Sequence, residues 1–327
     1  MMEAAKVRQM NVAGAALLWT GLLLLGVMLG NWRGFGGRPF AAAMAAAAVL
    51  LAWHLFPAAR GVKEWLGAKL SGNGALLAPL VPLVAYVFYA ALALGIDWRR
   101  MLVAAAYVLV PSALARISRG KPAGTVFDYL ALLSIWLPVE SRKLHWLWPY
   151  PPPLTHTLTI LLALSTAIAA FIFVRRLEGI GYAAEWKRGS AFALGFNFLI
   201  FTAIAIPFGE KIGFIHFAPS LERLRSLPLA ATGVLFFTAW PEEFLFRGLV
   251  QNLLTRTLRN EWAGLIVASV IFGFTHILHA PFPNWKYVLL ATIAGFFYGR
   301  AWIKTGSLLP GCFIHASVDT LWHLLFK

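Results

Sequence analysis

The stretch LFFTAWPEEFLFRGLV, from Leu235 to Val250, is almost entirely apolar, yet it carries Glu242, Glu243 and Arg247. An apolar run of this kind is typical of a helix in lipid, where ionisable side chains are costly and mark a functional site by default. On a helix, Glu243 and Arg247 are four residues apart and share a face, so they can form an ion pair. Glu242 points elsewhere, and an acid without a local partner suits the role of a general base. The alternative is that the segment ends at the membrane surface, where water solvates all three charges.

The rest of the chain repeats this apolar character. Of its 327 residues 60% are hydrophobic and 13% charged, about half the charged share of a soluble domain. The composition and the recurrence of long apolar runs predict an all-α, polytopic membrane helical bundle with about 8–11 transmembrane helices. The runs at 101–115 and 126–138 are short and are expected to be tilted, half-buried or interfacial. The apolar runs fall at 12–31, 39–57, 75–96, 101–115, 126–138, 157–174, 189–208, 228–250, 262–280, 286–303 and 307–326.

The basic residues lie between these runs. The formal net charge is +15, from 28 Lys and Arg against 13 Asp and Glu, and the positive charges occur in short clusters such as Arg99-Arg100 and Arg175-Arg176. This is the pattern of juxtamembrane anchors that contact lipid headgroups. It argues against a nucleic-acid partner, which needs one continuous basic face. We therefore expect a multi-pass integral membrane protein, in a bacterial cell membrane, with membrane lipids as partners and with 12–31 as a retained first helix.

Prolines suggest where the chain divides. The segment WLWPYPPPLTH, residues 146–156, contains three consecutive prolines, which cannot continue a helix. It is the best linker candidate, and we place a boundary between it and Arg188. The prediction is an N-terminal multi-helix region, 1–187, whose role the sequence does not indicate, followed by a second region, 188–327, that carries the ionisable residues.

Two further motifs place histidines in apolar segments. FGFTH ends at His276, and HASVD runs from His315 to Asp319, whose four-residue spacing puts both side chains on one helix face. A lone histidine is more often a satisfied interior side chain than a catalyst. Two acids, an arginine and two histidines on successive segments are harder to explain in that way. They predict a polar pocket inside the membrane.

Other features of this region are assigned to packing or to helix ends. Gly295 and Gly299 form a G-x-x-x-G pattern that lets helices approach closely. His279 is expected to mark a helix end, and His323 is expected to be interfacial. The single cysteine, Cys312, allows no internal disulfide.

Taken in order, the motifs EEFLFR, FGFTH and HASVD resemble a known signature. E-E-x-x-x-R, F-x-x-x-H and H-x-x-x-N/D are typical of the CAAX protease and bacteriocin-processing (CPBP) family of intramembrane proteases, which includes the Rce1-like prenyl-protein endopeptidases. The resemblance covers about residues 225–327. It implies an intramembrane endopeptidase within 188–327 that hydrolyses a peptide bond in a membrane-proximal or lipidated protein or peptide.

The resemblance also implies roles for individual residues. Glu242 activates a water molecule and His276 helps to position it. Glu243 and Arg247 form a supporting ion pair. His315, together with the residue at 319, forms an oxyanion site or binds a metal.

The use of a metal stays open at the level of sequence. Glu242, His276, His315 and Asp319 are all credible zinc ligands, and they would equally hold a water without a metal. The prenyl-protein endopeptidases carry Asn where this chain has Asp319, and an ionised Asp cannot donate a hydrogen bond to an oxyanion. Asp319 is therefore protonated, binds a metal or accepts a hydrogen bond from His315. We favour the last, in which Asp319 fixes the tautomer of His315.

Two other functions compete with the protease. A non-catalytic scaffold or immunity protein could keep the same fold, although the intact motifs argue against it. A transporter with an ionisable relay would spread its charges along a path and show repeats, whereas the charges here gather in one C-terminal cluster.

Overall fold

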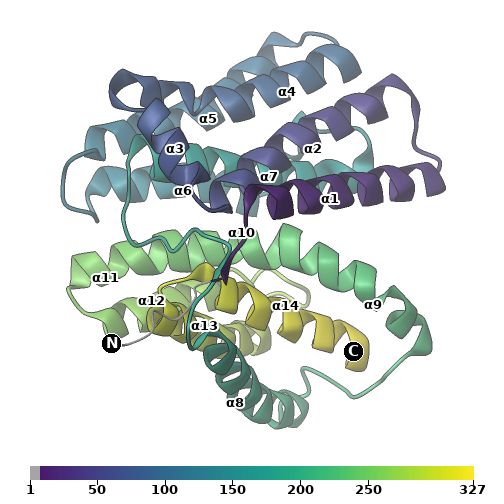
Figure 1. Ribbon diagram of the computed structural model, residues 1–327. Helices are drawn as coiled ribbons and strands as arrows, with labels where there is room; N and C mark the ends of the chain where they lie inside the picture. The colour runs from purple at the N-terminus through teal and green to yellow at the C-terminus, as the bar shows by residue number, and fades with distance from the viewer. Residues whose placement is uncertain (1–7) are drawn as a thin grey trace. The chain divides into compact units, whose positions relative to one another are not determined.

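The protein is all-helical apart from one short pair of strands (Figure 1), as the computed structural model of residues 8–327 shows. Each of the eleven predicted apolar runs overlaps a helix or a series of helical segments. The helices form two compact units, one of Met10–Glu178 and one of Gly179–Lys327 together with Arg8–Gln9. This division lies nine residues before the position predicted from the sequence.

The N-terminal unit holds five of the six helices that are long and apolar enough to cross a membrane in the described part of the chain. These are α1, α2, η1 with α4, α5, and the run from η3 to η4. The prediction of a short helix at 101–115 is wrong, because α5 extends over 21 residues. The elements are α1 (Val12–Trp32), α2 (Gly37–Ala58), α3 (Val62–Lys69), η1 (Gly72–Leu77), α4 (Leu80–Ala93), α5 (Trp98–Ser118), α6 (Val126–Glu140), η2 (His145–Leu147), η3 (Pro152–Leu154), α7 (Thr155–Ala167) and η4 (Ile168–Val174).

The proline-rich segment 146–156 is a packed part of this unit and does not separate the units. The ring of Trp148 is fully buried, with its centroid 5.1 Å from that of Tyr86 and 4.7 Å from that of Tyr89. The Tyr89 hydroxyl donates a hydrogen bond of 2.6 Å to the carbonyl of Tyr150. Burial of these aromatic rings fixes the segment against α4, an interaction that its composition alone did not indicate.

The C-terminal unit contains the sixth such helix, α8. Its strands β1 and β2 pair antiparallel, with Arg8 opposite Trp186. From Leu221 to Leu258 the chain is helical without interruption. The elements are β1 (Arg8–Gln9), β2 (Glu185–Trp186), α8 (Ser190–Lys211), α9 (Leu221–Val234), η5 (Leu235–Ala239), α10 (Trp240–Glu243), η6 (Phe244–Gln251), α11 (Asn252–Leu258), α12 (Glu261–Phe274), α13 (Trp285–Thr305) and α14 (Leu308–Leu325).

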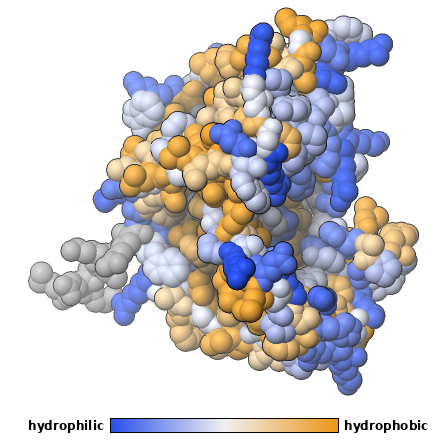
Figure 2. Space-filling model, turned by 90° about the vertical axis from the view of Figure 1, so that its right-hand side faces the viewer, coloured by the Kyte–Doolittle hydropathy of each residue, from blue (hydrophilic) through white to orange (hydrophobic). Residues whose placement is uncertain are grey.

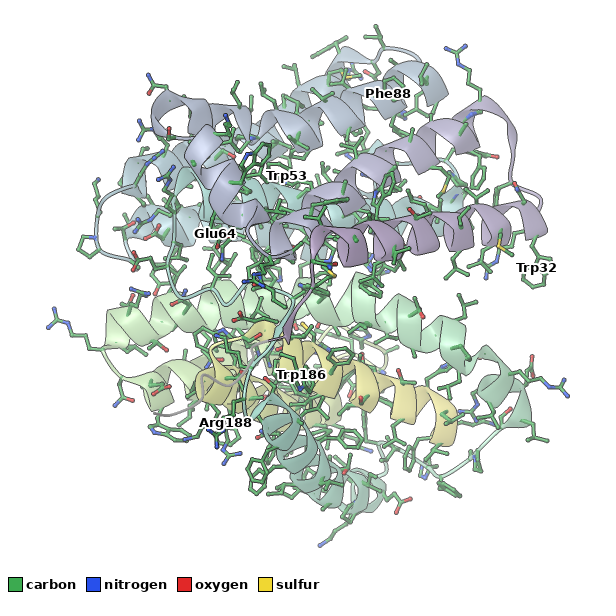
Figure 3. The ribbon with its side chains drawn as sticks, in the orientation of Figure 1. Trp32, Trp53, Glu64, Phe88, Trp186 and Arg188 are labelled. Carbon is green, nitrogen blue, oxygen red and sulfur yellow. The ribbon has the colours of Figure 1, made fainter. Side chains whose placement is uncertain are left out.

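Large apolar side chains face outward along these helices. Hydrophobic residues cover much of the face in Figure 2. On α1, Leu17 is 76% exposed and Met28 is 68% exposed, and the Trp32 side chain projects from the end of that helix (Figure 3). Outward apolar surface on helices of spanning length is what a lipid environment requires. Together these features show an integral membrane protein.

Glycines bring α13 close to its neighbours, as the G-x-x-x-G pattern predicts. A Cβ atom at Gly295 would lie 3.1 Å from the Cα of Ser269 on α12, and one at Gly299 would clash with the Gln251 side chain on η6. Any larger residue would force these helices apart. The helices that carry the predicted site are therefore held in direct contact through α13.

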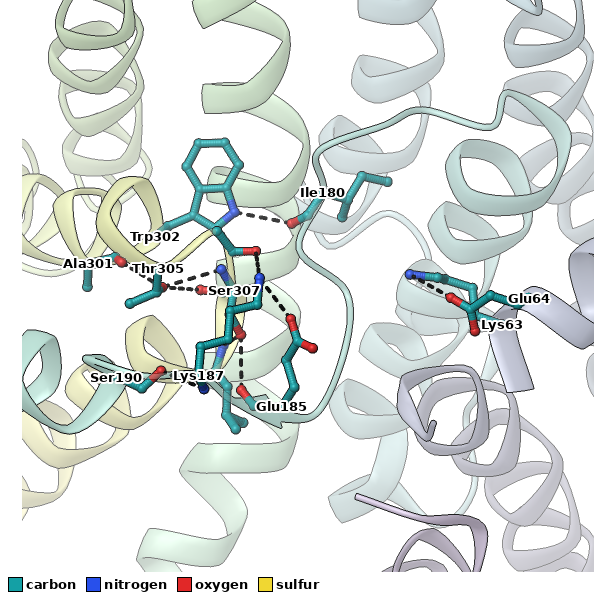
Figure 4. A network of polar contacts seen from close by, with 12 residues as sticks. Lys63, Glu64, Ile180, Glu185, Lys187, Ser190, Ala301, Trp302, Thr305 and Ser307 are labelled. Atoms are coloured by element: carbon teal, nitrogen blue, oxygen red, sulfur yellow. Dashed lines mark hydrogen bonds and ion pairs between the residues drawn. The ribbon is translucent and has the colours of Figure 1, made fainter. Parts of the chain in front are cut away.

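A polar network fixes the turn between α13 and α14 (Figure 4). Trp302 donates its indole N–H to the carbonyl of Ile180 at 3.2 Å, and the Lys187 ammonium lies 2.8 Å from the Glu185 carboxylate and 3.3 Å from the carbonyl of Gly306. The Gly306 backbone is left-handed, with φ of 60°, which favours glycine at this position. These bonds set the start of α14, the helix that carries His315.

Candidate active site

The helix that carries the Glu242-Glu243 pair departs from α geometry on both sides of it. η5 and η6 are wound as π-helix, and only the four residues of α10 between them are α-helical. Pro241 has no backbone N–H, so one hydrogen bond of the regular ladder is lost there. π-helical turns occur frequently at functional sites because they re-aim side chains.

The ion pair expected from the spacing of Glu243 and Arg247 is present. The Arg247 Nε atom lies 3.2 Å from Glu243 Oε2, and both side chains are buried. The guanidinium also donates to the carbonyl of Gly295 at 3.0 Å and lies 4.6 Å from the ring centroid of Phe272. A guanidinium over an aromatic face is stabilised electrostatically. Arg247 therefore connects η6, α12 and α13.

Glu243 uses its second oxygen to hold His315. The distance from His315 Nδ1 to Glu243 Oε1 is 3.0 Å, whereas His315 Nε2 lies 3.8 Å from Glu242 Oε2 and 3.5 Å from Asp319 Oδ2. An acid thus lies near each ring nitrogen of His315, and the expectation that Asp319 fixes the tautomer stays a prediction. Glu243 is closer, and it contacts the other ring nitrogen. The sequence could not show this, since 72 positions separate Glu243 from His315.

Close packing makes this contact specific. α14 approaches Glu243 so nearly at Gly311 that a Cβ atom there would lie 2.9 Å from Glu243 Oε2. The His315 ring is stacked on the ring of Tyr298, with centroids 4.8 Å apart and an interplanar angle of 20°. His315 is thus fixed by an acid at one ring nitrogen and by an aromatic face.

His276 lies just past the end of α12, which stops at Phe274. Its Nδ1 atom is 3.0 Å from the carbonyl oxygen of Phe272. A carbonyl can only accept, so Nδ1 carries the proton and donates it. In a neutral ring this leaves Nε2 as a hydrogen-bond acceptor.

Four of the six predicted residues line one cavity. Glu242, His276, His315 and Asp319 border a space of about 240 Å³ within the C-terminal unit. Glu243 is not among its lining residues and lies behind His315, with Arg247 beyond it. The structure therefore divides the set into groups that meet the cavity and groups that support them.

The cavity also contains residues that sequence reasoning missed. His279 was expected only to mark a helix end, yet it lines the cavity, and its ring stacks on that of His276 with centroids 5.7 Å apart. Tyr287 and Tyr298 of α13 also line it. Their spacing could have indicated this, because residues eleven apart on a helix lie on nearly the same face. His323, which is expected to be interfacial, is exposed.

The donor set does not form a metal site. Within residues 8–327 no group of three or more His, Cys, Asp or Glu side chains is arranged to hold a metal ion. The zinc set of Glu242, His276, His315 and Asp319 allowed by the sequence is therefore not supported, and we derive no step through a metal.

The fold and the cavity define an α-helical integral membrane protein with an acid–histidine site among its helices. Residues 224–321 match the family described as type II CAAX prenyl endopeptidase Rce1-like. The resemblance seen in the three motifs is confirmed, and all six predicted residues lie inside the matched part. The match supports a CAAX-type intramembrane protease. The comparisons with curated proteins and with solved structures found no match.

Proposed function

We propose that this protein is an intramembrane endopeptidase that hydrolyses a peptide bond in a membrane-proximal or lipidated substrate. The observation that carries the proposal is the convergence of Glu242 and His276 on one cavity with His315, which Glu243 orients. An acid, an acceptor nitrogen and an oriented histidine are the groups that water-dependent peptide hydrolysis needs.

In this proposal Glu242 is the general base. It takes a proton from a water molecule whose other hydrogen is directed by Nε2 of His276. The water oxygen then bonds to the scissile carbonyl carbon, and the proton on Glu242 passes to the leaving nitrogen as the C–N bond breaks. His315 lies 3.8 Å from Glu242 at its Nε2 and helps to hold the reacting groups in place.

The walls of the cavity support an apolar, membrane-associated substrate. Most of the remaining lining side chains are hydrophobic, among them Phe201, Phe214, Leu290 and Trp322. A pocket with apolar walls and a few polar groups binds an apolar chain and fixes its orientation through those groups. A lipidated or membrane-proximal peptide supplies such an apolar chain. Membrane lipids are the other expected partners.

The test is cleavage by the purified protein in liposomes. A membrane-anchored peptide with a C-terminal prenylated cysteine motif and the same peptide without the lipid are incubated with the unmodified protein and with Glu242→Ala. Mass spectrometry is expected to show two fragments whose masses sum to that of the peptide plus one water. Intact peptides throughout, or equal cleavage by Glu242→Ala, would refute the proposal.

A further inference from the structure

One face of α13 forms a wall of the cavity. Tyr287, Ala291, Ala294 and Tyr298 all line the cavity, and their spacings of four, three and four residues place them on one helical stripe. The two alanines leave space between the tyrosines. The stripe therefore carries a phenol at each end and two small side chains between them.

Each tyrosine of this stripe contacts one of the two histidines of the site. The ring centroids of Tyr287 and His276 are 4.4 Å apart, and those of Tyr298 and His315 are 4.8 Å apart. α13 thus sets the separation of two histidines that come from different elements.

Peptide hydrolysis needs a hydrogen-bond donor for the oxyanion of the tetrahedral intermediate. Several polar groups of the cavity are not free to donate. The carboxylates of Glu242 and Asp319 only accept when ionised. The Nδ1 protons of His276 and His315 are already directed at Phe272 and Glu243.

The Tyr287 hydroxyl is available for this role. Among the residues that the structure describes it has no hydrogen-bond partner. Its ring packs against Phe214 and Trp322, with centroids 5.2 Å and 5.3 Å away, and these two rings also contact each other. By contrast, the Thr202 hydroxyl in the same cavity donates to the carbonyl of Phe198 at 2.9 Å. Tyr287 therefore combines a fixed ring with a free O–H beside His276.

We infer that the Tyr287 hydroxyl donates the hydrogen bond that stabilises the oxyanion, which makes Tyr287 a catalytic residue of the proposed reaction. This inference rests on the proposed function. When the water oxygen bonds to the carbonyl carbon, the carbonyl electron pair moves to its oxygen, and the tyrosine O–H donates to that oxygen without giving up its proton. When the C–N bond breaks, the electron pair on the oxyanion re-forms the carbonyl double bond.

The test is the substitution Tyr287→Phe, which keeps the ring and removes only the hydroxyl. Loss of one oxyanion donor is expected to lower kcat roughly 10²-fold with KM unchanged, because the oxyanion exists only after attack. A purely structural role of the ring would leave kcat near the value of the unmodified protein. The matched control is Tyr150→Phe in the N-terminal unit, which is expected to keep kcat and KM.

The outcomes separate this inference from the proposed function. If Glu242→Ala abolishes cleavage while Tyr287→Phe keeps full kcat, the donor role of Tyr287 is refuted and the protease remains. The same holds if Thr238→Val, which removes another hydroxyl of the cavity, lowers kcat and Tyr287→Phe does not. If the unmodified protein cleaves nothing, both proposals are refuted. An unchanged melting temperature of Tyr287→Phe shows that a fall in kcat is not a folding defect.

Discussion

Residues 8–327 contain two buried arginine–carboxylate pairs, one in each unit, and the pairs differ in how completely their polar atoms are hydrogen-bonded. In the N-terminal unit Arg175 Nε lies 2.7 Å from Asp128 Oδ1, and a second nitrogen of the same guanidinium donates to the other carboxylate oxygen and to two backbone carbonyls. In the C-terminal unit Arg247 Nε lies 3.2 Å from Glu243 Oε2. There Arg247 Nη1 and Glu243 Oε2 make no hydrogen bond to the described residues.

The two carboxylates differ in their partners other than arginine. The Asp128 carboxylate accepts from the backbone N–H of Thr125, and the backbone N–H of Asp128 donates to the Thr125 hydroxyl oxygen, so the two residues complete a helix start. Glu243 is shared between Arg247 and a histidine that lines the cavity. A buried ion pair with complete hydrogen bonding holds a fold together, whereas a shared, incompletely bonded one also controls the position of a reacting group.

Asp128→Ala is expected to have the largest effect, and on stability alone. Removing one partner of a buried pair leaves an uncompensated charge, which costs about 3–5 kcal/mol in the free energy of unfolding. Thermal unfolding in detergent measures the loss, and Asp128→Asn is the milder companion because it retains a side-chain oxygen for the cap. If Asp128→Ala lowered kcat per folded molecule and left the melting temperature unchanged, the proposed difference between the two pairs would be wrong.

Glu243→Gln is expected to act mainly on activity. The amide keeps the size of the side chain but weakens its hold on His315 and Arg247, and misplacement of a catalytic group by about 1 Å costs roughly 10²-fold in rate. We expect kcat to fall by about that factor, measured in liposomes beside the melting curve. A variant that unfolds as readily as Asp128→Ala but cleaves normally when folded would show that both pairs are structural.

Asp319→Asn is expected to have the smallest effect. Asp319 lies 3.5 Å from the His315 nitrogen that Glu243 does not contact, so Glu243 still orients the ring in the variant. The amide accepts from His315 through its oxygen and can also donate. We expect kcat within about tenfold of the unmodified protein, a change of about 1.4 kcal/mol or less. Complete loss of cleavage together with loss of a stoichiometric metal would favour metal ligation by Asp319.

Much of the fold could be predicted from hydrophobic runs alone. All eleven runs overlap helices, because the backbone in lipid has to satisfy its own hydrogen bonds. The boundary at 178 and the packing of Trp148 could not be predicted, since they depend on which aromatic rings meet in three dimensions. The apolar run 101–115 is shorter than α5 because the charged residues Arg99, Arg100 and Arg116 belong to the ends of the helix.

The site could be predicted wherever partners are close in sequence. The pair Glu243–Arg247 and the pair His315–Asp319 both follow from a spacing of four residues. The contact of Glu243 with His315 could not be predicted, because no local rule relates residues on separate helices. The tyrosines of α13 were missed because aromatic residues are common on apolar helices and identify a site only once the histidines that they contact are known.

The central claim is that Glu242 is the base of a water-dependent endopeptidase, and the most direct test compares Glu242→Gln with Glu210→Gln. Glu210 is an exposed acid on α8 and provides the matched control. In liposomes with the lipidated peptide, we expect kcat of Glu242→Gln to fall roughly 10³-fold, within the range for loss of a general base, with its melting temperature retained. Glu210→Gln is expected to match the unmodified protein. Equal cleavage rates for the two variants would contradict the account.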